Sequence, residues 1–286
     1  MQLRLPLAHP HAGPGVSEVG ARSVLTPSRL ADYTVNAYTG CGHGCVYCYA
    51  RRFSRSSHPG EQWGTFVDVK VNAPQVLERE AARRGRGLVF LSSATDGWQP
   101  LEERYRLTRG CLEILLEHGF AVHVQTKSAL VQRDYDLLAG RRAVVVGITI
   151  TTLDPGVAAL FEPGASPPGD RVAAVERARS MGIDTTVFLG PLLPYISDRG
   201  QGLGRLLDAV AAARPQRVIV DRLNPRFGMW PGVVCALERC HPELVPLYRE
   251  VLYDGQARAR YSADLRRRIT FEAGRRGLGE RLQLCF

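Results

Sequence analysis

Lysine is nearly absent from this sequence, and long apolar runs and regularly spaced cysteines are missing as well. No run of about 18 apolar residues occurs, which excludes a membrane-spanning helix of the usual kind. The first ten residues hold no apolar stretch of about 7–15 residues, so they do not predict a secretory signal. Seven cysteines among 286 residues are too few and too unevenly placed for a disulfide scaffold. We therefore expect a soluble cytoplasmic protein with no membrane partner.

Positive charge is carried almost entirely by arginine. The chain has 37 Lys+Arg against 28 Asp+Glu, a formal net charge of +9, and its lysines are Lys70 and Lys127. An excess of arginine favours phosphate-bearing partners, above all nucleic acid. The other interpretation is a GC-rich coding sequence that encodes its positive charge with Arg codons. A hydrophobic content of 45% excludes a mainly disordered chain under either interpretation.

Short apolar runs alternate with helical patterns between residues 31 and 223. Several runs are apolar throughout, which is typical of parallel strands that are covered on both faces. The alternation predicts an α/β fold, either a partial (β/α)6 TIM-like barrel or a doubly wound sheet. The predicted strands are Tyr33–Asn36, Leu88–Ser93, Ala121–Thr126, Val144–Thr151, Thr185–Leu189 and Arg217–Arg222. The predicted helices are Pro74–Arg84, Leu101–Glu117, Leu130–Ala139, Arg171–Met181 and Leu203–Ala213.

Two further regions flank this alternation. Residues 1–30 are rich in Pro, Gly and His and predict an irregular N-terminal arm. After Asn224 the alternation stops, and residues 224–286 predict a C-terminal extension that is partly helical, aromatic and rich in Arg. No linker separates this extension as an independent domain, so we expect it to pack on a barrel formed by residues 31–223.

Three cysteines fall within eight residues, in the segment Thr-Gly-Cys-Gly-His-Gly-Cys-Val-Tyr-Cys-Tyr. Cys41, Cys45 and Cys48 have the spacing C-x3-C-x2-C, and the intervening glycines let the backbone wrap three thiolates around one small object. Three thiolates do not complete a tetrahedral zinc site, and His43 would strain the loop as a fourth ligand. A [4Fe–4S] cluster is the better match, because three ligands leave one iron open. A zinc-stabilised nucleic-acid-binding protein is the alternative of a different class.

Further motifs follow these cysteines in a regular order. They are Val69-Lys-Val-Asn-Ala-Pro, Ser93-Ala-Thr-Asp-Gly-Trp-Gln-Pro-Leu-Glu, Leu107-Thr-Arg, Thr126-Lys-Ser, Arg133-Asp-Tyr-Asp-Leu-Leu, Thr149-Ile-Thr-Thr-Leu-Asp, Glu162-Pro and Gly190-Pro-Leu-Leu-Pro. Together with the cysteine segment they resemble the radical S-adenosylmethionine superfamily and, within it, the spore photoproduct lyase-like branch. The resemblance covers roughly residues 30–200 and implies a partial (β/α)6 barrel.

The resemblance also implies two cofactors, a [4Fe–4S] cluster on the three cysteines and S-adenosylmethionine on its open iron. One electron from the reduced cluster would cleave the cofactor to a 5′-deoxyadenosyl radical, which removes a hydrogen atom from a substrate. By the same resemblance, Ser93, Lys127 and Thr149 would hold the amino and carboxylate groups of the cofactor. Tyr47 would lie against the adenine. The alternatives are a solvated surface Lys127 and a Tyr47 that only packs under the loop. An electron donor such as flavodoxin or ferredoxin is implied as a partner.

The substrate side departs from the family pattern at one position. Spore photoproduct lyase returns a hydrogen atom from a cysteine on its second strand, and Leu91 occupies the corresponding position here. The repair reaction is therefore not implied. The charge favours a nucleic-acid or nucleotide substrate, whereas Leu91 favours a peptide or a small natural product. The substrate-side candidates are Tyr49, Cys235 and Cys240, and an auxiliary cluster would use Cys235, Cys240 and Cys285.

Three other features have mainly structural interpretations. Cys111 lies on an apolar helical stripe and is predicted to belong to the core. Asp96 is expected to form a structural salt bridge with Arg104 or Arg109. The segment Asn224-Pro-Arg-Phe-Gly-Met-Trp-Pro-Gly follows the sixth strand, where it either caps the barrel or stacks on a base or ring of the substrate.

Overall fold

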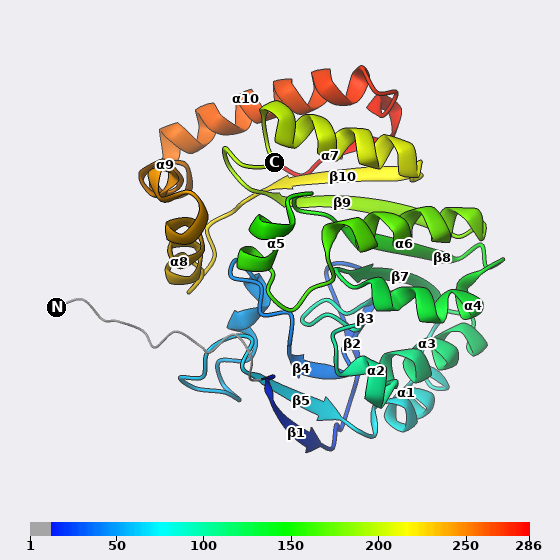
Figure 1. Ribbon diagram of the computed structural model, residues 1–286. Helices are drawn as coiled ribbons and strands as arrows, with labels where there is room; N and C mark the ends of the chain where they lie inside the picture. The colour runs from blue at the N-terminus through cyan, green and yellow to red at the C-terminus, as the bar shows by residue number, and fades with distance from the viewer. Residues whose placement is uncertain (1–12) are drawn as a thin grey trace.

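An eight-stranded sheet forms the centre of the computed structural model, which describes residues 13–286 (Figure 1). The strand order is β11-β10-β9-β8-β7-β6-β3-β2, and every neighbouring pair is parallel except β2 and β3. In the described part of the chain, β2 and β11 are the edges, so the sheet stays open. The strands are β2 (Leu25–Pro27), β3 (Tyr33–Val35), β6 (Leu88–Leu91), β7 (Ala121–Thr126), β8 (Val144–Thr149), β9 (Asp184–Leu192), β10 (Arg217–Arg222) and β11 (Leu282–Leu284).

All six predicted strands are present as consecutive parallel neighbours, which confirms the α/β fold. β7 and β10 have the predicted bounds. β9 extends to Leu192, three residues beyond the prediction. Five of the six residues of β8 are buried, as expected for a strand that is covered on both faces.

Helices follow the parallel strands and lie along the right and upper sides of the sheet in Figure 1. They are α1 (Ala73–Ala81), α2 (Glu102–Tyr105), α3 (Leu107–Glu117), α4 (Tyr135–Leu138), α6 (Pro168–Ser180) and α7 (Gly200–Ala213). A short helix, α5 (Pro155–Phe161), follows β8. Cys111 of α3 is fully buried, which confirms its place in the core. In the chain from residue 13 onward, no helix is both long enough and apolar enough to cross a membrane.

Two predicted helices are interrupted. The helix expected over Leu101–Glu117 breaks at Arg106, whose φ is 51°. The break follows from Glu102, whose carboxylate accepts hydrogen bonds from the backbone N–H groups of Thr108 at 3.0 Å and Arg109 at 3.1 Å. These N–H groups lie in the first turn of α3, where no intrahelical partner exists. The helix expected over Leu130–Ala139 is a 3-10 helix, η2 (Ala129–Asp134), followed by α4.

The N-terminal arm contains regular structure that the sequence did not predict. β1 (Gly15–Val19) pairs with β5 (Phe66–Lys70), and β5 pairs with β4 (Tyr38–Gly40), in a separate three-stranded sheet. β2 also falls within this arm, so an irregular conformation is wrong for both strands. The first four residues of β1 are exposed, which explains why they carry no hydrophobic alternation. Residues 1–12 of the predicted arm lie outside the described residues.

The C-terminal extension contributes both helices and a strand. Its elements are α8 (Trp230–Cys240), η3 (Pro242–Leu244), α9 (Val245–Tyr253), α10 (Gly255–Gly274), η4 (Gly279–Arg281) and β11. β11 lies parallel to β10, so the extension completes the sheet as well as packing on it. Met229 is fully buried in a second apolar cluster, and Trp230 packs against that cluster. This packing supports the capping interpretation for these two residues, whereas Phe227 is 63% exposed.

Candidate functional site

The three closely spaced cysteines lie in the loop between β4 and a 3-10 helix, η1 (Tyr49–Arg52). Cys41 and Cys45 are each 6% exposed, Cys48 is partly buried, and all three are free thiols. Burial raises the pKa of Cys41 to about 12 and also raises the pKa values of Cys45 and Cys48. The charges of Cys41 and Cys48 both raise the pKa of Cys45, so the three sulfur atoms are electrostatic neighbours. We call residues 41–48 the cysteine loop.

Glycines allow other segments to approach the backbone of this loop. Gly44 has a φ of +59°, a conformation that favours glycine. A Cβ atom on Gly64 would lie only 2.7 Å from the Cα atom of Gly44, and one on Gly164 would collide with the carbonyl oxygen of Gly42. The glycines predicted to let the loop wrap therefore also make room for the chain segments that surround it.

Hydrogen bonds from three distant segments fix the cysteine loop. The Gly42 N–H donates to Gln99 Oε1 at 2.7 Å, and the Val46 N–H donates to the Phe161 carbonyl at 2.9 Å. The Arg51 guanidinium donates to the Val46 carbonyl at 2.7 Å and also to the Gly228 carbonyl. The loop is thus attached to the segment after β6, to α5 and to the C-terminal extension.

His43, at the centre of the loop, pairs with a buried carboxylate. Its Nδ1 lies 3.3 Å from Asp96 Oδ2. Asp96 also accepts hydrogen bonds from the Thr126 hydroxyl at 2.6 Å and from the Lys127 backbone N–H at 2.8 Å. Burial alone would raise the pKa of Asp96, but His43 and these donors lower it to about 2. The contact with Asp96 therefore occupies His43 Nδ1, which argues against His43 as a fourth zinc ligand.

The expected salt bridge between Asp96 and an arginine is wrong. Arg109 instead pairs with Glu113, Asp134 and Asp136. Arg104 lies over the ring of Tyr105, 5.0 Å from its centroid. Asp96 follows β6 and is buried against Thr126 at the end of β7, whereas Arg104 belongs to α2 and Arg109 to α3.

The predicted cofactor-binding residues Ser93, Lys127 and Thr149 follow or end three adjacent strands, β6, β7 and β8. Ser93 Oγ accepts a hydrogen bond from the Thr34 hydroxyl at 2.7 Å, and its carbonyl accepts one from the hydroxyl of Tyr49. The Thr149 hydroxyl is buried and accepts a hydrogen bond from Gln125 Nε2 at 2.8 Å. The structure thus brings Ser93 next to Tyr49, a substrate-side candidate.

Lys127 is half-buried instead of lying on a solvated surface. Its Nζ is 5.6 Å from the centroid of the Tyr47 ring. Burial acts to lower the pKa of Lys127, but the negative charges of Cys45 and Glu162 outweigh it and raise the pKa. The ammonium group therefore lies within electrostatic reach of the cysteine loop.

Glu162 is a site residue that sequence reasoning did not single out. Its carboxylate accepts hydrogen bonds from the hydroxyl groups of Tyr47 and Thr151, and it pairs with Arg171 Nη1 at 2.6 Å. Both charged side chains are 1% exposed. The motif Glu162-Pro was visible in the sequence, but its partners were not, because Tyr47 lies 115 positions away. The Tyr47 ring belongs to the second apolar cluster, and its predicted contact with adenine stays a prediction.

The structure does not gather the three C-terminal cysteines. Cys235 and Cys240 are five positions apart on α8, which places them about 140° apart around the helix axis. The Cys240 thiol donates to the Ala236 carbonyl at 3.3 Å, and Cys285 is exposed beyond β11. Cys235 and Cys240 stay predictions as substrate-side candidates.

Within residues 13–286, no three His, Cys, Asp or Glu side chains converge as a single metal ion requires. A single zinc ion needs its ligands at about 2.0–2.3 Å from one point. A four-iron cluster takes its thiolates further apart, because each binds a different iron atom. Three neighbouring thiols, two of them buried and one partly buried, match the sulfur-only donor set of an iron–sulfur cluster.

Comparison with known proteins places this arrangement in a family. Residues 35–203 match the family model described as the Radical SAM superfamily. An uncharacterised protein of Mycobacterium tuberculosis is 36% identical over 230 residues, which cover 78% of this chain and 68% of that protein. The Radical SAM Nalpha-GlyT isomerase of Pseudomonas phage M6 is 24% identical over 221 residues, which cover 77% of this chain and 45% of that protein.

Solved structures share the fold. Spore photoproduct lyase complexed with dinucleoside spore photoproduct matches with a TM-score of 0.67 and 15% identity, over 95% of this chain and 82% of that one. This likeness confirms the resemblance to the spore photoproduct lyase-like branch at the level of the fold. Because the family model spans more than half of the sequence, this chain belongs to the radical SAM superfamily.

Proposed function

We propose that this chain is a cytoplasmic enzyme that holds a [4Fe–4S] cluster on Cys41, Cys45 and Cys48 and uses S-adenosylmethionine to abstract a hydrogen atom from a substrate. The observation that carries the proposal is the set of three neighbouring free thiols, two buried and one partly buried, beside the half-buried Lys127. The open sheet then serves as a partial (β/α)6 barrel with the site at the carboxyl ends of its strands. When bound, the two cofactors supply one-electron cleavage of a carbon–sulfur bond.

The residues of the chain prepare this site in distinct ways. The Lys127 ammonium offers a charge-assisted bond to the cofactor carboxylate, and the Ser93 and Thr149 hydroxyl groups offer hydrogen bonds to its polar end. Glu162 fixes the hydroxyl of Tyr47 and so orients the ring under Lys127. Tyr49 is 41% exposed and reaches Ser93, so it lies where a substrate would approach. A flavodoxin or ferredoxin would deliver the electron.

We propose a nucleic acid or nucleotide as the substrate class. The net charge of +9 supports it, and so does the shared fold with a lyase whose structure holds a dinucleoside photoproduct. A peptide or small natural product is the second candidate, and Leu91 favours it. That side chain is only 1% exposed within the main core, so no hydrogen donor occupies this position of β6.

A cysteine substitution tests the reaction. The anaerobically reconstituted protein should contain about four iron and four sulfide per chain and form 5′-deoxyadenosine with dithionite. Cys45→Ala should lose both the brown colour and this product, whereas Cys285→Ala, which removes an exposed thiol outside the loop, should keep them. A Cys45→Ala protein that still forms 5′-deoxyadenosine, or a colourless wild-type protein that holds zinc, would overturn the proposal.

A further inference from the structure

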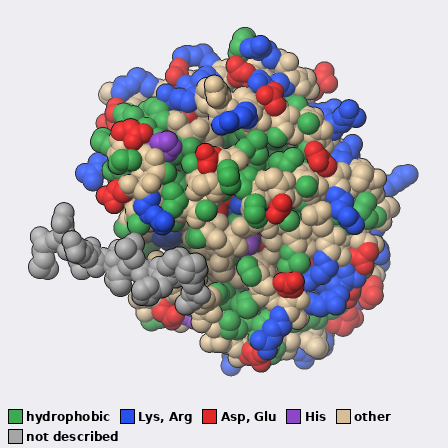
Figure 2. All heavy atoms as spheres, viewed as in Figure 1, with side chains coloured by type: hydrophobic (Ala, Val, Ile, Leu, Met, Phe, Trp, Pro, Cys, Tyr) green, Lys and Arg blue, Asp and Glu red, His purple; other side chains and the backbone are tan. Residues whose placement is uncertain are grey.

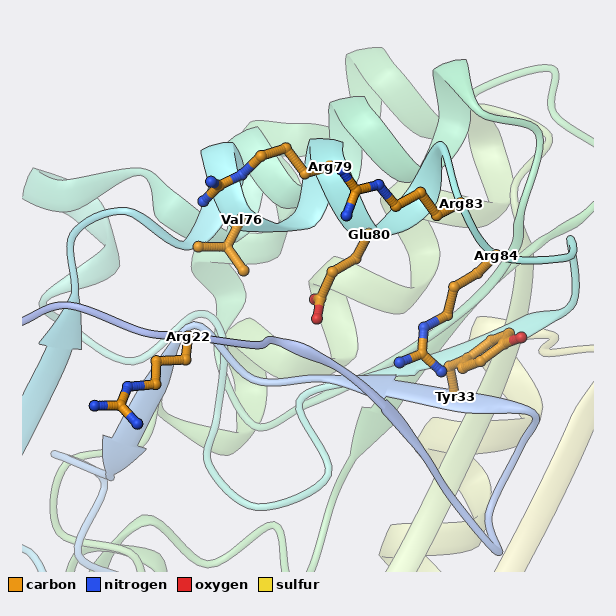
Figure 3. Close-up of a pocket in the computed structure, with 7 residues that line it drawn as sticks. All are labelled: Arg22, Tyr33, Val76, Arg79, Glu80, Arg83 and Arg84. Carbon is orange, nitrogen blue, oxygen red and sulfur yellow. The ribbon is translucent and has the colours of Figure 1, made fainter.

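A cavity of about 680 Å³ lies between α1, the segment before β2 and the start of β3, and four arginines line it (Figure 3). Arg79, Arg83 and Arg84 come from α1 and the turn after it, and Arg22 comes from the segment before β2. Arg84 lies over the Tyr33 ring, 5.8 Å from its centroid. Figure 3 shows Arg22 and Arg79 on one side of the cavity, with Arg84 and Tyr33 on the other. We call this the arginine cavity.

The carboxylate inside the arginine cavity already accepts hydrogen bonds from other parts of the chain. Glu80, the acidic residue of the lining, accepts hydrogen bonds from the Ser23 hydroxyl at 2.5 Å and from the backbone N–H groups of Val24 at 2.9 Å and Leu25 at 2.8 Å. Burial acts to raise the pKa of Glu80, but these donors and the charge of Arg84 lower it, so the carboxylate stays ionised at neutral pH. Four arginines and one glutamate leave the lining with a formal charge of +3.

The arginines face little opposing charge in the lining, where the charge of Glu80 interacts with that of Arg84. In the part of the chain that the structure describes, none of these four guanidinium groups forms an ion pair with an acidic side chain, whereas Arg109, Arg133 and Arg276 elsewhere each form two or more. Arg79 and Arg83 are four positions apart on or beside one helix, a spacing at which like charges repel. The fold thus holds a concentration of positive charge that it does not neutralise.

The arginine cavity and the predicted cofactor-binding residues lie at opposite ends of the parallel strands. Tyr33 is the first residue of β3, and the turn after α1 leads to the start of β6. The cavity therefore lies at the amino ends of the parallel strands, whereas Ser93, Lys127 and Thr149 lie at their carboxyl ends. Figure 2 shows Lys and Arg scattered over the viewed face, so overall charge alone does not define a site. The site is defined instead by the convergence of four arginines on one cavity.

We infer that the arginine cavity binds phosphate groups, either those of a free polyphosphate or nucleotide or those of a nucleic-acid backbone. Guanidinium groups form paired hydrogen bonds with phosphate oxygens, and a volume of this size suits a small ligand. The Tyr33 ring offers an apolar wall beside the cations. The inference is independent of the reaction proposed for the cysteine loop, because no residue is shared.

Binding of two probes to the reconstituted protein tests this inference. The probes are inorganic tripolyphosphate and a 12-nucleotide single-stranded DNA, each titrated calorimetrically at low salt and at 0.3 M salt. The test variant is Arg79→Gln/Arg83→Gln, at two exposed positions, of which position 79 lies in α1, where glutamine keeps helix propensity. The control is Arg205→Gln/Arg275→Gln, which removes the same charge from exposed positions on α7 and after α10.

The test variant should bind tripolyphosphate about tenfold or more weakly than wild type, while the control binds it equally well. If the DNA loses affinity in parallel, a nucleic-acid backbone is the source of the phosphate; if only tripolyphosphate does, the source is a small ligand. An equal loss in the control variant would overturn the inference, because attraction would then reflect net charge alone. Absence of binding to both probes at low salt would overturn it as well. Cluster content and 5′-deoxyadenosine formation should be the same in all three proteins.

Discussion

At the scale of single residues, Glu162 connects several groups near the cysteine loop. Its carboxylate joins Tyr47, Thr151 and Arg171, and its negative charge reaches Lys127. A buried ion pair contributes little net stability as a pair, but removal of one partner leaves the other charge buried and uncompensated. Glu162 and Arg171 are both nearly inaccessible to solvent, so this argument applies to them in full.

Glu162→Gln should lower the free energy of unfolding by about 3–5 kcal/mol, because the Arg171 guanidinium then has no counter-charge. Urea unfolding followed by circular dichroism measures the change. The double variant Glu162→Gln/Arg171→Met removes both charges and should recover part of the loss. A single variant that loses less than about 1 kcal/mol would show that water compensates Arg171.

Lys127→Ala should weaken binding of S-adenosylmethionine by about 10- to 100-fold, since it removes one charge-assisted bond. Equilibrium dialysis against the reconstituted protein measures the affinity. Iron content should not change, because no cluster ligand is altered. Because Lys127 is half-buried over Tyr47, a modest drop in melting temperature is also expected. Wild-type affinity in the variant would refute the assignment, and loss of iron would make the lysine structural.

At the scale of elements, the contact between α1 and the segment 23–25 depends on one ionised carboxylate. Glu80 accepts three hydrogen bonds from that segment, and its pKa is lowered. A group whose pKa is lower in the folded state stabilises the fold above its unfolded pKa of about 4.3, and this contribution disappears as the pH falls through the folded value.

Glu80→Gln should therefore be less stable than wild type at pH 7, by about 1 kcal/mol, because the carboxylate is partly exposed. This difference should narrow as the pH decreases from 5 to 3, where Glu80 itself becomes protonated. Urea unfolding of both proteins at a series of pH values measures the difference, and other titrating groups cancel in the comparison. A difference that stays constant over this range would contradict the role of the charge.

The elements that sequence reasoning found and those it missed differ in a physical way. Several of the central strands, β8 among them, are apolar along most of their length, and burial on both faces favours that pattern. β1 is mostly exposed, and β2, β4 and β11 are three residues each, too short for any period to show. The break at Arg106 depends on the Glu102 carboxylate accepting hydrogen bonds from the next turn, a side-chain contact that helix propensities do not include.

At the scale of the whole molecule, the candidate site also has features that the sequence predicts and features that it does not. The spacing of the three cysteines marked the loop directly, and the family resemblance marked Ser93, Lys127 and Thr149 at the ends of adjacent strands. The partners that fix these residues could not be read from the sequence, because pairs such as His43 with Asp96 join segments that only the fold brings together. A buried carboxylate and an exposed one look alike in a sequence.

The attachment of Arg51 to the Gly228 carbonyl has a consequence for how the protein is made. The two residues are 177 positions apart, so the cysteine loop leaves the ribosome long before the segment that closes against it. At about 5–20 residues per second, that interval lasts roughly 9–35 s. During translation the three thiols therefore belong to a nascent chain in which the contact between Arg51 and Gly228 has not yet formed.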